Sequence, residues 1–200
     1  MIKRLFDLFF SIVGLFFLAP IFLIIAFLIK LDSNGPVLFR QERTGLKGGI
    51  FKIHKFRTME ILSEEKSRLT VGKDKRITQL GLFLRKYKID ELPQLIDVFI
   101  GKMSLVGPRP EVQEFINLYP LDVKNIVLSV RPGITDRASI EMLNETDILG
   151  KYDNPRKAYV DIILPKKQNY YIDYVENQSL WMDVTIIFLT LKKLFKLIVR

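Results

Sequence analysis

The apolar residues of the chain are concentrated at its two ends. Residues 8–29 form an uncharged run of 22 positions. A straight helix of that length measures roughly 33 Å, which is enough to cross the hydrocarbon core of a bilayer. A signal peptide fits the run less well, because no cleavage site with small residues follows it before Lys30. The pattern therefore predicts a membrane helix.

Pro20 lies in the middle of this run and leaves two topologies open. Proline removes a backbone donor and crowds the preceding turn, so the helix should bend there. A spanning helix tolerates one proline. A helix broken at Pro20 would instead have two arms of about 12 residues, roughly 18 Å each, which reach one leaflet deep. Length by itself favours a spanning helix. The positive charges of Lys3, Arg4 and Lys30 on both flanks weaken this preference, because such residues prefer the cytoplasmic side and a broken helix would keep both flanks there.

Short β-type segments follow the membrane run. Residues 37–39 and 50–53 are rich in β-branched and aromatic side chains. Gly45, Gly48 and Gly49 lie between them. Two such segments joined by a glycine-rich connection predict a β-hairpin.

The strongest helical periodicity in the polar part begins at Asp90. An apolar stripe follows at the i, i+3, i+4 and i+7 positions, and it consists of Leu92, Leu95, Ile96 and Phe99. Asp90 is in the N-cap position, and Gly101 stands just past the predicted end. Further helices are predicted from Thr78 as a cap through Lys86, and at residues 111–118 and 168–176.

The last predicted helix covers residues 180–199. It carries a broad apolar stripe, with Lys192, Lys193, Lys196 and Arg200 on the opposite side. This pattern is typical of a helix that lies in a membrane interface. A helix packed on the domain core has a similar pattern, and three apolar residues interrupt the polar face. The sequence leaves both placements open.

Charge points to an anionic partner. The 200 residues have a formal net charge of +9, and residues 30–109 hold 17 Lys and Arg against 9 Asp and Glu. Nucleic acid, a phosphate-rich ligand and an anionic membrane face all suit such a balance. The chain has no cysteine, which excludes disulfides, thiolate chemistry and zinc sites built on sulfur.

The Asp90-Glu91 pair is the main candidate for chemistry. Acidic residues at a helix start commonly do no more than cap free N–H groups. Here cations surround the pair in the sequence: Arg85, Lys86 and Lys88 upstream, Arg109 between two prolines, and Lys52, Lys55 and Arg57 in the second strand. If they converge, they form a phosphate site around two carboxylates. Carboxylates in such a site suit Mg²⁺ binding or nucleophilic attack, and a helix N-terminus would keep Asp90 ionised.

Four ordered motifs resemble the bacterial sugar transferase family, the monotopic polyprenyl-phosphate phosphoglycosyltransferases. They are Lys-Ile-His-Lys-Phe-Arg-Thr-Met at residues 52–59, the stretch 85–95 with Asp-Glu-Leu-Pro-Gln-Leu, Gly-Lys-Met-Ser-Leu-Val-Gly-Pro-Arg-Pro at 101–110, and Arg-Pro-Gly-Ile-Thr at 131–135. The N-terminal run with its proline and Ser-Leu-Trp-Met-Asp at 179–183 match as well. The resemblance covers nearly the whole chain and is closest to the short members with a minimal catalytic domain.

The resemblance implies an α+β, mostly helical fold. Residues 1–31 would form a re-entrant membrane helix-break-helix at Pro20, which enters and leaves through one face. Residues 32–200 would form the catalytic domain, with a small β-hairpin and interfacial amphipathic helices. The implied location is the cytoplasmic face of the bacterial inner membrane.

The resemblance also implies a reaction. Asp90 would attack the β-phosphate of a UDP-sugar, giving a phosphosugar-enzyme intermediate and releasing UMP, and polyprenyl (undecaprenyl) phosphate would then take the phosphosugar. Glu91, with Asp90, would hold Mg²⁺. Phosphate binding falls to Arg85, Arg109, Lys55 and Arg131. The product would start the assembly of a polysaccharide, an O-antigen or a glycoprotein glycan.

Some features of the chain depart from the family pattern. Many members continue the Arg-Pro-Gly-Ile-Thr motif with Gly, whereas residues 136–140 read Asp-Arg-Ala-Ser-Ile here. This region is expected near the nucleotide or sugar, so the donor sugar is not carried over. Ala19 stands where many members have Ser before the proline. This chain therefore lacks a hydroxyl that could hydrogen-bond a freed carbonyl. His54, the one histidine, alternates with apolar Ile53, which favours a structural role over a general base.

Two other classes of function compete. A basic membrane adaptor would use the cations to bind anionic lipid, but surface binding needs no proline-locked arginine. An RNA-binding protein suits the pI of about 9.6. The hydrophobic ends and the lack of a nucleic-acid motif argue against it. Besides donor and acceptor, membrane lipids are expected partners and nucleic acid is not; homodimer formation stays open.

Overall fold

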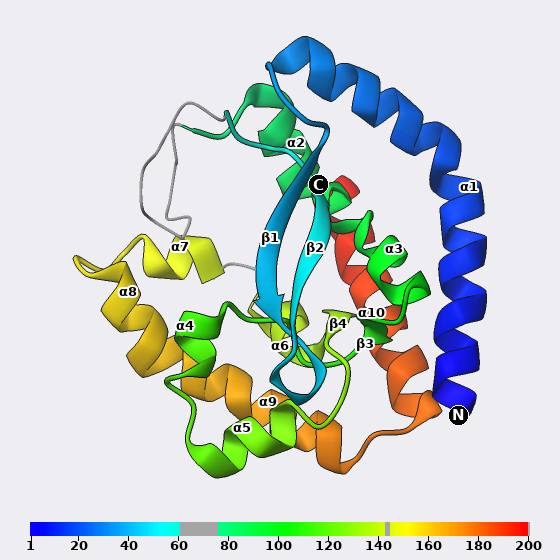
Figure 1. The fold of residues 1–200 in the computed structure, drawn as a ribbon. Coiled ribbons are helices and arrows are strands. Elements are labelled where there is room, and N and C mark those ends of the chain that lie inside the picture. Colours follow the sequence, from blue (N-terminus) through cyan, green and yellow to red (C-terminus); the bar gives the residue numbers. More distant parts are fainter. Residues whose placement is uncertain (61–75, 143–144, 200) are drawn as a thin grey trace.

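The computed structural model describes residues 1–60, 76–142 and 145–199. Helices dominate these residues, and two small sheets join them (Figure 1). In chain order, the elements are α1 (Ile2–Asp32), β1 (Leu38–Thr44), η1 (Leu46–Gly48), β2 (Ile50–Phe56), α2 (Gln79–Lys86), η2 (Ile89–Glu91), α3 (Gln94–Phe99), β3 (Ser104–Val106), α4 (Gln113–Ile116), α5 (Leu121–Val127), β4 (Gly133–Thr135), α6 (Arg137–Glu141), α7 (Glu145–Leu149), α8 (Pro155–Ala158), η3 (Tyr159–Ile163), α9 (Leu164–Glu176) and α10 (Leu180–Ile198).

The N-terminal run forms one long helix, α1. Within the described residues it is the helix long and apolar enough to cross a membrane. Figure 1 shows that it changes direction about halfway along, as a proline in the middle of a helix predicts. The helix nevertheless continues through Pro20, so the expected interruption between two arms is replaced by a bend. Most of its large apolar side chains are exposed, and the exceptions include Ile25 and Ile29.

Two buried carboxylates fasten the start of α1 to the domain. Asp7 accepts hydrogen bonds from Ser104 Oγ at 3.1 Å and from the next backbone N–H at 3.0 Å. Asp183, on α10, accepts from Lys3 Nζ at 2.6 Å and from the Tyr174 hydroxyl at 2.7 Å. Both carboxylates are almost completely buried. Because all of these donors are satisfied, α1 is held in a defined orientation against β3 and α10.

The predicted hairpin is confirmed and is longer than the sequence indicated. Strands β1 and β2 pair antiparallel from Leu38 opposite Phe56 to Thr44 opposite Ile50. A tight turn joins them, and Gly48 there has a φ of 78°, which glycine adopts without strain. Phe51 and Ile53 of β2 pack in one buried cluster with Val98 of α3 and Met103, which follows that helix.

A second sheet was not predicted. Strands β3 and β4 pair in parallel, with Ser104 opposite Gly133 and Val106 opposite Thr135. The backbones meet so closely that a Cβ on Gly133 would lie 2.1 Å from the nitrogen of Gly107. The glycines therefore allow the two proline-containing loops, residues 106–110 and 131–135, to lie side by side.

The helical half of the domain contains the largest core cluster. Helix α2 begins as predicted, since the Thr78 side chain accepts from the Gly81 N–H. The helix predicted at residues 111–118 shortens to α4. Helix α9 starts earlier than predicted, because Pro165 falls in its first turn, where its missing N–H is not needed.

Helix α10 matches the predicted last helix and has two unlike faces. Ile186 and Asp183 are buried against the domain, so one side packs on the core. Trp181 is 80% exposed, and Phe188 and Phe195 are also exposed. One face of α10 therefore packs on the domain, and the domain leaves the opposite, apolar face uncovered.

Candidate functional site

Asp90 and Glu91 lie on a short turn between two helices. Lys88 takes the left-handed conformation, with a φ of 58°, and reverses the chain after α2. The pair then forms the 3₁₀ turn η2, and α3 begins only at Gln94, after Pro93. The predicted helix start at Asp90 was therefore wrong by one turn. Asp90 is not an N-cap, since α3 has no side-chain cap bond.

The carboxylate of Asp90 is buried, and one of its two oxygens has no hydrogen-bond partner among the described residues. The residue is 7% exposed, and its Oδ1 atom has no donor among the described residues. Burial raises the pKa of Asp90, and the charge of Glu91 raises it further against the opposing cations Lys55, Lys88 and Arg85. The sequence placed Asp90 at a helix N-terminus, which favours the ionised form; in the structure α3 begins only at Gln94, and the surroundings of Asp90 raise its pKa. An unsatisfied buried acceptor costs free energy, which a ligand can recover.

Glu91 has the opposite environment. Arg109 holds it with a two-pronged contact: Nη1 donates to Oε2 at 3.0 Å, and Nη2 donates to Oε1. Lys55 Nζ adds a bond of 2.7 Å to Oε1. Burial by itself would raise the pKa of Glu91, but the charges of Arg109 and Lys55 outweigh it and hold the pKa well below the ordinary value. Glu91 is thus ionised and fully paired, whereas the Oδ1 atom of the adjacent Asp90 has no partner among the described residues.

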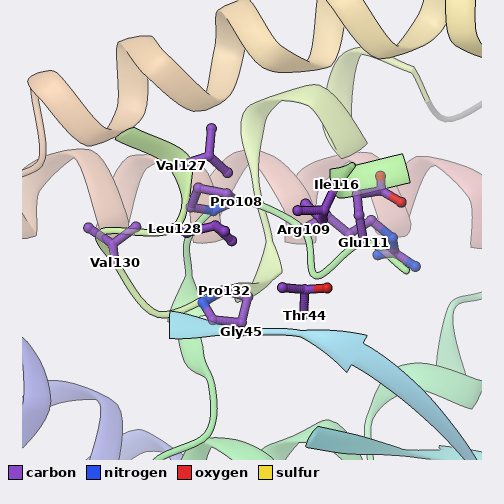
Figure 2. A pocket seen from close by; sticks show the side chains of 10 residues that line it. All are labelled: Thr44, Gly45, Pro108, Arg109, Glu111, Ile116, Val127, Leu128, Val130 and Pro132. Carbon is purple, nitrogen blue, oxygen red and sulfur yellow. The ribbon is translucent and has the colours of Figure 1, made fainter. Parts of the chain in front are cut away.

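Separate segments of the chain bring these groups together. Lys55 comes from β2, and the carboxylates come from η2. Arg109 comes from the loop after β3, which the parallel pairing with β4 fixes. Figure 2 shows this loop near the end of β1, where Arg109, Glu111 and Thr44 border a small cavity. The convergence predicted from the sequence is therefore confirmed for these groups.

The other predicted cations divide into two groups. Arg85 donates to the Thr58 hydroxyl at 2.8 Å, and its charge acts on Asp90. Arg131 does not contact either carboxylate; its Nε donates to the Gly101 carbonyl at 2.9 Å. The structure thus gives Arg131 a role in holding the end of α3, and its phosphate contact stays a prediction.

Two cations of the second strand segment serve other parts of the fold. Arg57 donates to the carbonyls of Asn34 at 2.7 Å and Ser33 at 2.6 Å, so it holds the end of α1. Lys52 is exposed and lies 3.9 Å from Glu42. These contacts place both outside the carboxylate cluster.

His54 has the structural setting that its strand position indicated. Its Nδ1 lies 2.8 Å from Asp97 Oδ1, and its backbone N–H donates to Asp97 Oδ2 at 2.8 Å. Asp97 is fully buried in α3. The pair joins β2 to α3 and has no contact with Asp90 or Glu91.

Sequence reasoning missed several charged groups near Arg109. Arg43, on β1, is half-buried near it, and Glu111 and Asp136 are buried there. Burial raises the pKa of Asp136, although bonds from Ser139 oppose this shift. The predicted first strand ends at residue 39, whereas β1 continues to Thr44 and carries Gln41 and Arg43 on one face.

The residues of the site fit a magnesium ion only partly on their own. The described residues contain no group of three or more His, Asp and Glu side chains that could hold a metal. Mg²⁺ commonly takes one or two protein carboxylates and completes its shell with water and substrate phosphates. The unpartnered Oδ1 of Asp90, next to Glu91, is compatible with that mode of binding.

Comparison with known proteins identifies the family. The bacterial sugar transferase family matches residues 1–197. The chain belongs to the bacterial sugar transferase family. This match agrees with the resemblance that the four motifs carried.

Individual relatives share the whole length of this chain. A UDP-glucose:undecaprenyl-phosphate glucose-1-phosphate transferase of Klebsiella pneumoniae is 39% identical over 197 residues, covering 96% of this chain and 40% of the relative. A UDP-N-acetylgalactosamine-undecaprenyl-phosphate N-acetylgalactosaminephosphotransferase of Aeromonas hydrophila is 36% identical, covering 96% and 43%. An exopolysaccharide production protein of Rhizobium leguminosarum bv. phaseoli is 39% identical, covering 94% and 92%. The chain thus spans less than half the length of the first two relatives.

Proposed function

We propose that this protein transfers a sugar 1-phosphate from a UDP-sugar to polyprenyl phosphate and releases UMP. The observation that supports it most is the buried Asp90 carboxylate, whose Oδ1 has no partner among the described residues although the cations Lys55, Lys88 and Arg85 act on it. A structural aspartate would be hydrogen-bonded. The names of the relatives supply the donor and acceptor classes, since they act on UDP-sugars and undecaprenyl phosphate.

The reaction has two half-reactions. In the first, an Asp90 oxygen attacks the β-phosphorus of the donor, and the bond from that phosphorus to the bridging oxygen breaks. The bridging oxygen leaves with UMP, and the sugar phosphate stays on Asp90 as an acyl phosphate diester. In the second, an oxygen of polyprenyl phosphate attacks the same phosphorus. The Asp90 carboxylate is released, and a polyprenyl diphosphate sugar forms.

The cations of the site suit this transfer of negative charge. Arg109, Arg85 and Lys55 are placed to bind pyrophosphate oxygens as the donor enters. Glu91 holds Arg109 and Lys55 in position.

Asp90 and Glu91 are the residues that would hold Mg²⁺. The ion would supply positive charge that offsets the charge of the pyrophosphate. To bind the ion, Glu91 would have to give up part of its contact with Arg109 or Lys55. The N–H groups released in this way could donate hydrogen bonds to the phosphates of the UDP-sugar.

The membrane location follows from α1 and α10. The exposed apolar length of α1 and the uncovered face of α10 both suit lipid. We place the catalytic domain on the cytoplasmic face of the inner membrane, with α1 entering and leaving through that face. Labelling at residue 2 and at residue 47 should then report the same side, and opposite sides would establish a spanning helix.

The transfer is tested by UMP release. Purified protein with Mg²⁺ and a panel of UDP-sugars should release UMP with one donor or a few. We expect Asp90→Asn to reduce the rate by at least about a thousandfold, because a neutral amide cannot attack phosphorus. Asp122→Asn, which changes an exposed aspartate on α5, is the matched control and should keep the wild-type rate.

A near-normal rate for Asp90→Asn would exclude Asp90 as the nucleophile. The panel also addresses the sugar. Relatives named for glucose and for N-acetylgalactosamine are similarly identical to this chain, at 39% and 36%. Overall similarity therefore does not select between these donors.

A further inference from the structure

Arg43 shares a face of the hairpin with the site. The register pairs Arg43 with Phe51 and Gln41 with Ile53. Side chains two residues apart on a strand point to the same face, so all four lie on the buried face of the hairpin. Lys55, two residues after Ile53, lies on that face as well. Arg43 therefore approaches the carboxylate cluster from the opposite end of β2.

The contacts of Arg43 leave one donor unused in the interior. Nη2 donates to Gln41 Oε1 at 2.6 Å, and Nη1 donates to the Pro110 carbonyl at 3.2 Å. The nearest carboxylate oxygen, on Glu111, is 4.0 Å away, which is too long for a hydrogen bond. The Nε atom is buried and has no partner among the described residues. A guanidinium prefers two parallel bonds to an oxyanion, and Arg43 has none.

The carboxylates that act on Arg43 make no hydrogen bond with it. Burial lowers the pKa of Arg43; Glu111 opposes this shift, and the like charge of Arg109 adds to it. Glu91 also acts on Arg43, but its oxygens are already bonded to Arg109 and Lys55. Arg43 thus has Glu111 only at 4.0 Å and Glu91 only through oxygens that other cations already hold, so a phosphate oxygen at its Nε would be stabilised.

We propose that Arg43 binds a phosphate oxygen of the UDP-sugar through its unpartnered Nε, as a second guanidinium beside Arg109. This inference rests on the proposed function and adds a residue to its donor site. The competing account is structural: Arg43 would only steady the Arg109 loop through the Pro110 carbonyl. The first account predicts that replacing Arg43 weakens phosphate binding, and the structural account predicts that it does not.

Donor kinetics and pyrophosphate binding test the proposal. In the full-length protein, Arg43→Gln should raise the KM for the UDP-sugar and weaken the binding of inorganic pyrophosphate, each by about tenfold, since one charged hydrogen bond is lost. The KM for polyprenyl phosphate should stay unchanged. Arg43→Lys keeps the charge and should restore part of both losses. Arg40→Gln removes the same charge from an exposed residue of β1 and should change neither.

Several outcomes would overturn the inference. An unchanged donor KM and pyrophosphate affinity, with a lowered melting temperature, would leave Arg43 a structural role only. A change confined to the KM for polyprenyl phosphate would assign the contact to the acceptor. If the wild-type protein releases no UMP from any donor, the proposed function fails, while the pyrophosphate measurement still decides on Arg43.

Discussion

Two regions of the molecule bury aspartates in opposite ways. At the start of α1, Asp7 and Asp183 are each surrounded by donors, and every contact is short. On η2, Asp90 is almost as deeply buried, yet its Oδ1 has no partner among the described residues. In the first region the carboxylates hold a helix in place. In the second, one carboxylate oxygen is left to interact with a bound ligand.

The difference shows why burial alone does not identify a functional aspartate. A buried carboxylate that is fully hydrogen-bonded stabilises the fold, whereas one left unsatisfied persists only because neighbouring groups hold it. Glu91 does that here, since it organises Arg109 and Lys55 next to Asp90. The predictions below change one side of this comparison at a time.

The largest effect on stability is expected for Glu91→Gln. The change removes the charged carboxylate that both Arg109 and Lys55 contact in a largely enclosed site, which should destabilise the protein by about 3 kcal/mol. Chemical denaturation of the wild-type and variant proteins at neutral pH measures the difference. Glu114→Gln, on α4, is a control at a more exposed ion pair, and it should change stability by less than about 1 kcal/mol.

The same residue predicts an acid dependence. The pKa of Glu91 is lowered on folding, so its contribution to stability is complete above the ordinary value of 4.5 and is lost as the pH falls below that value. The stability difference between wild type and Glu91→Gln should therefore shrink as the pH falls below about 4.5. A difference that stays constant through that range would show that Glu91 is not paired as described.

A smaller loss is expected for Asp183→Asn. It weakens the contact with Lys3, which is itself partly exposed, so the cost should be about 2 kcal/mol. UMP release per folded molecule should stay within about twofold of wild type, because the site does not contain Asp183. A loss of activity comparable to that of Asp90→Asn, in a protein that remains folded, would show that the orientation of α1 controls the chemistry.

The smallest change should be a gain in stability for Asp90→Asn. The pKa of Asp90 is raised on folding, so ionisation near neutral pH works against the folded state, and a neutral amide removes that cost. We expect about 1 kcal/mol, or roughly 2–4 °C in melting temperature. A clear loss of stability would indicate that Asp90 is paired after all, and the contrast with Asp183 would disappear.

Local sequence signals predicted much of the fold. The glycine-rich hairpin, the Thr78 cap and the last helix follow from side-chain periodicity and capping, which act over a few residues. The start of α3 was misplaced because Lys88 adopts a left-handed conformation, a choice that packing makes and composition does not reveal. The parallel β3–β4 pair joins segments too short to show a strand pattern.

The site was predicted in part, for a similar reason. Lys55, Arg85 and Arg109 could be selected because motifs and prolines marked them, and the structure gathers them around the pair. Arg131 carried the same type of motif but bonds the end of α3 instead. No local signal shows which cation faces a carboxylate, because that depends on contacts between distant segments.

The most direct test of the account is the mass of the protein after incubation with Mg²⁺ and an accepted UDP-sugar, without polyprenyl phosphate. The account predicts an added sugar phosphate on Asp90, together with one released UMP per enzyme, and no adduct on the Asp90→Asn variant. UMP release that requires polyprenyl phosphate, with no adduct under any donor-only condition, would contradict a covalent role for Asp90.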